Sequence, residues 1–204
     1  MALDKLGDVE RQLGNHESAR RYYRRSLSVA EALAASRPED RSTYRGLIIS
    51  GNKLGELDRL AGDLDAARAA FERSMRLAES QAEVDPGDVD ARRDLAICCD
   101  RLGDVCRRAG DLETAGQHYA RGLELARSLM AADPDSAQAR RGTAIALNKL
   151  AELRRQGGDR DGTSEAHREA LALTEPMADA APDDAQLQLD VAYICHRLGD
   201  LEAE

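Results

Sequence analysis

Apolar residues recur along the chain at steps of three and four, which is the spacing of one face of an α-helix. Between Asp88 and Asp133, one stripe consists of Leu95, Cys98, Cys99, Leu102, Val105, Cys106 and Ala109, and a second of Leu112, Ala115, Tyr119, Leu123, Ala126 and Met130. Gly110 separates the stripes, and Asp111 suits the N-cap of the second helix. No stretch alternates with period two, so the pattern predicts paired helices of about 20 residues and no sheet.

This helix pair recurs every 48 residues. Leu102-Gly103-Asp104-Val105 is one of a set that also contains Leu6-Gly7-Asp8-Val9, Leu54-Gly55-Glu56-Leu57 and Leu198-Gly199-Asp200-Leu201, and Pro38, Pro86, Pro134 and Pro182 keep the same step. A lone pair cannot bury both of its stripes, whereas stacked pairs can. We therefore expect an all-α solenoid that forms a single domain over residues 1–204. Its units are 1–38 (truncated), 39–86, 87–134, 135–182 and a half-unit 183–204, that is, about four helix pairs and a final helix.

The two ends of this array differ from its middle. The half-unit holds one helix, from about Asp184 to Glu204, which we expect to cap the fourth unit. The first helix, from Ala2 to about Leu13, lacks the first half that its equivalents have. This indicates either a piece of a longer array or end-to-end docking of the last helix onto the first unit of another copy.

The fourth unit departs most from the common pattern. Gly157-Gly158 predicts a longer turn between its helices, and Pro176 lies inside its predicted second helix. Because a proline within a helix costs about 3 kcal/mol or forces a kink, we expect a bend or an early end near Thr174.

Charge and composition narrow the classes of partner. The net charge is −9 and the pI about 5.1, which argues against nucleic acid and anionic membrane surfaces, since both require a basic footprint. No apolar run approaches the roughly 18 residues that span a bilayer, and no signal-peptide block opens the chain. The four cysteines lack the spacing of a metal site or a disulfide framework. We expect a cytoplasmic protein with reduced thiols and no cofactor.

The repeated residues resemble those of the tetratricopeptide repeat family. That pattern places Leu-Gly in the first helix, Ala and an aromatic four residues later in the second, and then Pro. It is met by Leu54-Gly55, Ala67, Phe71 and Pro86, by Leu102-Gly103, Ala115, Tyr119 and Pro134, and by Leu6-Gly7, Ala19, Tyr23 and Pro38. The fourth unit keeps Leu150 and Pro182 but has Ala151, Thr163 and His167 at the other positions.

The repeat is longer than the family's usual one. Forty-eight residues replace the usual 34, and the additional residues fall seven on each side of the proline. Seven residues are about two helical turns, so each helix lengthens without rotating its apolar face. Long repeats of this kind resemble those of bacterial signalling and defence proteins, which implies a protein-binding arm of a larger protein.

Residues able to perform catalysis are few. Cys98 and Cys99 occupy a small-to-apolar part of the first-helix stripe, so they are interpreted as packing thiols, with a redox or metal site as the alternative. His167 stands where other units have an aromatic ring, which favours a core position. No nucleophile–base spacing appears. We therefore expect no enzymatic activity and no metal.

One constellation of charged residues returns near the end of every first helix. At one position of each repeat the residue is basic: Lys5, Lys53, Arg101, Lys149 and Arg197. Nearby positions are polar or charged in the same way from repeat to repeat, and we call each such set of equivalent residues a column. These columns supply the candidate partner-binding residues Asn52, Glu56, Arg59, Asp100, Asp104, Arg107, Asn148, Glu152, Arg155, His196 and Asp200. On a helix, Asn52, Glu56 and Arg59 share one face.

Two interpretations of these repeated polar and charged residues remain. The charges could form an intramolecular ladder worth about 0–1 kcal/mol per exposed pair. They could also line a groove for a peptide, because asparagine amides match backbone groups and arginines hold carboxylates in a fork. In the resembling family the first helices line the concave surface. The resulting hypothesis is a non-catalytic scaffold for a protein or peptide partner; the alternative is a structural spacer or a rod that self-assembles end to end as a homo-oligomer.

Overall fold

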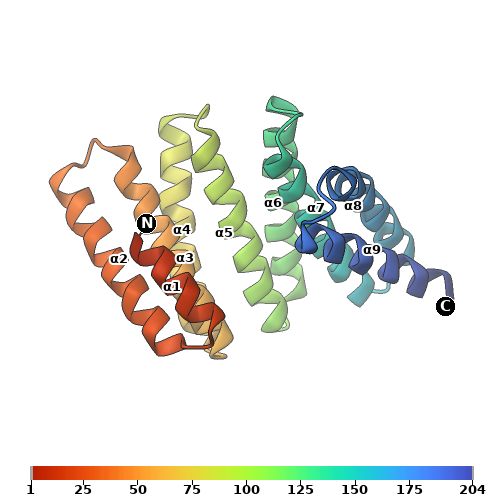
Figure 1. The fold of residues 1–204 in the computed structure, drawn as a ribbon, viewed down its shortest axis with the longest axis horizontal. Helices are drawn as coiled ribbons and strands as arrows, with labels where there is room; N and C mark the ends of the chain where they lie inside the picture. The colour runs from red at the N-terminus through yellow and green to blue at the C-terminus, as the bar shows by residue number, and fades with distance from the viewer. Residues whose placement is uncertain (1, 204) are drawn as a thin grey trace. The chain divides into compact units, whose positions relative to one another are not determined.

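The computed structural model of the chain describes residues 2–203, and in that range it contains helices and no strand (Figure 1). In chain order these are α1 (Ala2–Gln12), α2 (His16–Ser36), α3 (Arg41–Leu60), α4 (Leu64–Val84), α5 (Val89–Arg108), α6 (Leu112–Ala132), α7 (Ala137–Gln156), α8 (Arg160–Ala180) and α9 (Ala185–Ala203). From α2 onward, both the first helices and the second helices begin 48 residues apart. The all-α prediction and the predicted helix lengths are confirmed.

The helices group into two compact units that divide between Gly110 and Asp111. In unit 1, which contains α1 to α5, each helix packs against the next one in the chain, and α3 also contacts α5. In unit 2, which contains α6 to α9, the neighbours in the chain again pack against each other. The division falls inside the predicted unit 87–134, and the single domain stays a prediction.

Short turns join each first helix to its second helix through a glycine in the left-handed region. The φ angle is +83° at Gly62, +84° at Gly110 and +78° at Gly158, a conformation that glycine adopts without strain. The following aspartate then caps the next helix, as where Asp111 Oδ1 accepts a hydrogen bond of 3.1 Å from the backbone N–H of Thr114. The predicted roles of Gly110 and Asp111 are confirmed.

The expected longer turn at Gly157-Gly158 is wrong. Gly157 caps α7 with the backbone conformation of Ala109 at the end of α5, and Gly158 takes the φ angle of Gly110. The turn therefore keeps the geometry of its equivalents, because a glycine in place of alanine adds no residue.

The core of unit 1 depends on a close approach between aromatic rings and glycines. Tyr23 and Phe71 are buried completely, and the ring of each lies against a glycine of the preceding first helix, Gly7 and Gly55. A Cβ atom added to Gly55 would lie 2.8 Å from Cε1 of Phe71. Any side chain at this position would force the two helices apart.

The thiols of α5 are part of this interior. Cys98, Cys99 and Cys106 are buried, and burial raises the pKa of Cys98 to about 12, so that thiol is protonated at neutral pH. Cys195 of α9 is exposed.

The expected early end of the helix near Thr174 is wrong, whereas a bend there stays a prediction. Helix α8 continues to Ala180 with Pro176 inside it. A proline there removes one hydrogen bond, to the carbonyl group four residues earlier, but Met177 and Ala178 on the next turn are buried in a cluster with Leu187 of α9. This packing holds the last turn of α8 in place. Helix α9 thereby covers the fourth unit as predicted, to Ala203; Glu204 lies outside the described residues.

Replacement of Gly55 by alanine tests the ring–glycine contact. We expect Gly55→Ala to lower the free energy of unfolding by about 1–3 kcal/mol, because overpacking against Phe71 exceeds the gain in helix propensity. The matched control is Gly199→Ala in α9, where no atom lies within 4 Å of the new Cβ. There the propensity gain of up to about 1 kcal/mol should be retained. Urea unfolding followed by circular dichroism measures both; equal effects would contradict the packing argument.

Candidate protein-interaction surface

The candidate residues of unit 1 lie on the C-terminal halves of α3 and α5. Asn52, Glu56 and Arg59 on α3 are half-buried, and so are Asp100, Asp104 and Arg107 on α5. Asp100 and Asp104 each take part in a polar or electrostatic contact. Part of each of these side chains is therefore accessible to solvent.

Glu56 is the most heavily paired carboxylate among these residues. Arg59 Nε donates a 2.8 Å hydrogen bond to Glu56 Oε2, and Arg101 Nη1 of α5 donates one of 3.1 Å to the same oxygen. Burial alone would raise the pKa of Glu56, but the hydrogen bond from Arg59 and the charge of Arg101 outweigh it and lower this pKa below its usual value. Glu56 is thus an ionised anchor for two arginines.

The same pairing recurs along the chain with a constant offset. In unit 1, Lys53 pairs with Asp8 as Arg101 pairs with Glu56, and in unit 2 Arg197 Nε lies 2.9 Å from Glu152 Oε1. In all three pairs the basic residue follows the acid by 45 positions. Each pair therefore connects one first helix to the first helix before it, which is the arrangement of an intramolecular ladder.

In unit 2, Glu152 has the same anchoring role. Its carboxylate accepts hydrogen bonds of 2.7 Å from the Tyr193 hydroxyl and 3.2 Å from Arg155, in addition to its ion pair with Arg197. Burial again acts to raise the pKa of Glu152, but these partners lower it. Arg155 itself is exposed.

His196 and Asp200 lie on the exposed surface of α9. The two residues contact each other, with 3.1 Å between His196 Nδ1 and Asp200 Oδ2. Both side chains are open to solvent.

The two asparagines face neighbouring helices. Asn52 Nδ2 donates to Cys98 Sγ of α5 at 3.4 Å, and Asn148 Oδ1 lies 3.1 Å from Nδ1 of His167 on α8. His167 is completely buried, as the sequence predicted for a ring substitute, and its Nε2 has no hydrogen-bond partner among the described residues. Burial lowers the pKa of His167 below 6.5.

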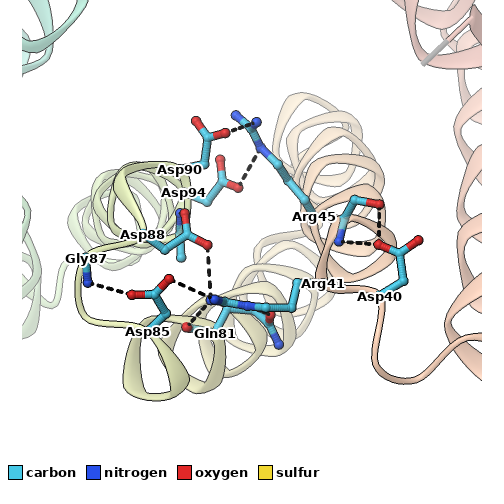
Figure 2. A network of polar contacts seen from close by, with 11 residues as sticks. Asp40, Arg41, Arg45, Gln81, Asp85, Gly87, Asp88, Asp90 and Asp94 are labelled. Atoms are coloured by element: carbon cyan, nitrogen blue, oxygen red, sulfur yellow. Dashed lines mark hydrogen bonds and ion pairs between the residues drawn. The ribbon is translucent and has the colours of Figure 1, made fainter.

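A second charged network, which the sequence analysis missed, lies at the other end of the first helices in unit 1. Figure 2 shows Arg41 and Arg45 of α3 reaching toward the aspartates around the start of α5. Arg45 Nε lies 3.2 Å from Asp94 Oδ2, and burial raises the pKa of Asp94 to about 6 against the opposing charge of Arg45.

This second network has an equivalent in unit 2, where Arg141 Nη2 lies 3.5 Å from Asp190 Oδ2. Both pairs, Arg45–Asp94 and Arg141–Asp190, are separated by 49 residues. The recurrence of an arginine and an aspartate 49 residues apart is the feature of the sequence from which these ion pairs could have been predicted.

The chemistry available here is that of recognition by charge and hydrogen bonds. Within residues 2–203, no group of three or more His, Cys, Asp and Glu side chains is placed to hold a metal ion. No helix in the described part of the chain has the length and apolar character needed to cross a bilayer.

Comparison with known proteins agrees with the repeat pattern. Two family models, both described as tetratricopeptide repeat, match residues 1–36 and residues 52–105. The crystal structure of BtubC (BKLC) from P. vanneervenii is similar with a TM-score of 0.68 at 19% identity, covering 98% of this chain and 73% of that one. The apo form of RapI is similar with a TM-score of 0.67 at 12% identity, covering 96% and 68%. At these identities the likeness shows the fold, and it confirms the predicted solenoid class. No curated protein matches the chain.

The buried His167 predicts a pH dependence of stability. Because its folded-state pKa lies below 6.5, unfolding takes up a proton between that pKa and 6.5, and the free energy of unfolding falls as the pH drops through this range. We expect His167→Phe to lose less stability than the wild type between pH 7.5 and pH 5.5 in urea titrations. The control is the exposed His196→Asn, which should alter the pH dependence less than His167→Phe does; identical curves for all three proteins would contradict this role of His167.

Proposed function

Because this chain is a tetratricopeptide-repeat protein, we propose that it is a non-catalytic scaffold that binds a peptide or protein partner through the face formed by its first helices. The observation that carries the proposal is the repetition of arginines held in place by an ionised glutamate, at Glu56 in unit 1 and at Glu152 in unit 2. In each unit, cations that are already held in position suit the carboxylates of a partner, since less side-chain freedom is lost on binding.

In this proposal the ladder and the groove are the same structure. Glu56 holds Arg59 and Arg101 in position, and both side chains stay partly exposed to solvent. The planar fork of a guanidinium group matches a carboxylate. Arg107 stands one repeat after Arg59 and is half-buried. An incoming carboxylate, from an acidic side chain or a chain terminus, would bind between these guanidinium groups.

The remaining candidates take supporting roles in the proposal. Asp100 and Asp104 would position cations on α5 as Glu56 does on α3, and Asn52 and Asn148 would hold the seams between helices through Cys98 and His167. On unit 2, Arg155, His196 and Asp200 offer exposed polar groups to a partner. The net charge of −9 supports a protein rather than nucleic acid or an anionic membrane as the ligand.

The proposal also includes the larger protein to which this chain would belong. The resemblance to long repeats of bacterial signalling and defence proteins supports a role as one arm of a larger cytoplasmic protein. The self-assembling rod is the competing function, and it requires association between copies.

The arginine face can be tested with a displayed library of random peptides that have free C-termini. We expect selected peptides to bind the wild type and to bind Arg59→Ala/Arg107→Ala at least about tenfold more weakly, since a hydrogen bond to a charged group contributes roughly 1.5–3 kcal/mol. Fluorescence anisotropy measures the affinities, and circular dichroism verifies that helicity is unchanged.

The control for this experiment is Arg24→Ala/Arg25→Ala, which removes two exposed arginines of α2. A loss of affinity in the control as large as in the first variant would indicate non-specific charge attraction. Unchanged binding to Arg59→Ala/Arg107→Ala would remove this face as the binding site.

A further inference from the structure

Helix α1 leaves exposed two apolar side chains whose equivalents in α5 are buried. Leu6 and Val9 recur 96 residues later as the same residues, Leu102 and Val105 of α5. Leu102 and Val105 are 1% and 0% exposed, whereas Leu6 and Val9 are 49% and 52% exposed. The same pair of leucine and valine is therefore covered by other side chains in α5 and exposed to solvent in α1.

The structure shows what covers these positions elsewhere in unit 1. Leu102 and Val105 form a cluster with Ala67 and Phe71 of α4, against which Met75 also packs. The covering element is thus a second helix that places Ala, an aromatic ring and a long aliphatic side chain four residues apart.

The equivalent interface one repeat earlier has the same composition. There Leu57 of α3 is clustered with Ala19 and Tyr23 of α2, and Leu54 packs against them. Leu27 of α2, four residues after Tyr23, borders a small cavity together with Leu54 and with Leu77 of α4. The covering helix therefore contacts both helices of the next pair.

The uncovered face extends from α1 onto α2 in the same way. Val29 of α2 stands at the position of Leu77 and is exposed, as is Leu33 one turn later. Val29 and Leu33 also line a cavity of about 450 Å³ that reaches α3 at Thr43 and Gly46. An isolated exposed leucine is ordinary, but four exposed apolar side chains on two packed helices, two of them lining a cavity, are typical of an interaction site.

We propose that the face formed by Leu6, Val9, Val29 and Leu33 binds an amphipathic helix of a partner protein. The partner helix carries the pattern Ala-x3-Tyr/Phe-x3-Leu/Met and docks on α1 as α4 docks on α5. This site continues the interfaces already present in unit 1, and it is separate from the arginine face of the proposed function.

A second copy of the chain is a less suitable occupant. Of its second helices, α2, α4 and α8 are each packed between two first helices of their own unit. Their apolar stripes are consequently already buried. The stripe of α6, with Ala115, Tyr119 and Leu123, is buried as well.

The test uses the chain's own second helix as the probe, because α4 covers the identical Leu-x2-Val pair. A labelled peptide of residues 63–84, acetylated and amidated at its ends, is titrated with the 204-residue chain and followed by fluorescence anisotropy. We expect saturable 1:1 binding. The same peptide with Phe71→Asp should bind at least about tenfold more weakly, since it lacks the ring.

Two exposed positions, Val9 in α1 and Leu13 directly after that helix, locate the peptide on the chain. Val9→Asp places a charge in the proposed interface and should abolish binding at concentrations that saturate the wild type. Leu13→Asp is the matched control: Leu13 is 69% exposed, and its equivalents Ala61 and Ala109 are exposed as well, so binding should be retained. Both variants should keep the wild-type helicity, because neither side chain is buried.

Several outcomes overturn the proposal. Absence of saturable binding does so, as does binding that Val9→Asp leaves intact, since the peptide would then dock elsewhere. Concentration-dependent sedimentation of the chain alone that Val9→Asp abolishes would assign the face to a second copy. The Arg59→Ala/Arg107→Ala variant should bind this peptide like the wild type, which separates failure of this inference from failure of the proposed function.

Discussion

The ring of Phe71 lies between two first helices, and much of unit 1 depends on that position. On one side it contacts the backbone of Gly55 in α3, and on the other it is clustered with Leu102 and Val105 of α5. A single side chain thereby sets the separation of two helices, because a glycine admits the ring and the aliphatic pair closes over it. Tyr23 has the corresponding place one repeat earlier.

The charged ladder is a consequence of this spacing. Once the rings determine how far one first helix lies from the next, the basic residue of one helix meets the acid of the helix before it, as Arg101 meets Glu56. Such partly exposed pairs contribute little to stability individually. They also hold arginine side chains in position at the surface, so the residues that connect neighbouring first helices are those through which we propose that a partner binds.

The fourth unit shows how far the arrangement tolerates substitution. His167 replaces the aromatic ring and Ala151 the glycine, and both residues are completely buried. The substitution introduces a polar atom, Nε2, without a hydrogen-bond partner among the described residues. The buried interior of the fourth unit thereby acquires a dependence on protonation.

The sequence by itself determined the helices, their 48-residue register, the glycine turns with their aspartate caps, the buried thiols of α5 and the core position of His167. Most of these properties depend on residues a few positions apart, so the helical period allows them to be predicted from the sequence. The contacts of Asn52 with Cys98 and of Arg45 with Asp94, the continuation of α8 through Pro176, the exposure of Cys195 and the division at Gly110 were decided by the tertiary structure. The physical reason is that the 45- and 49-residue pairings depend on how far one helix is displaced along its neighbour, and this displacement results from side-chain packing between helices rather than from the periodicity within each helix.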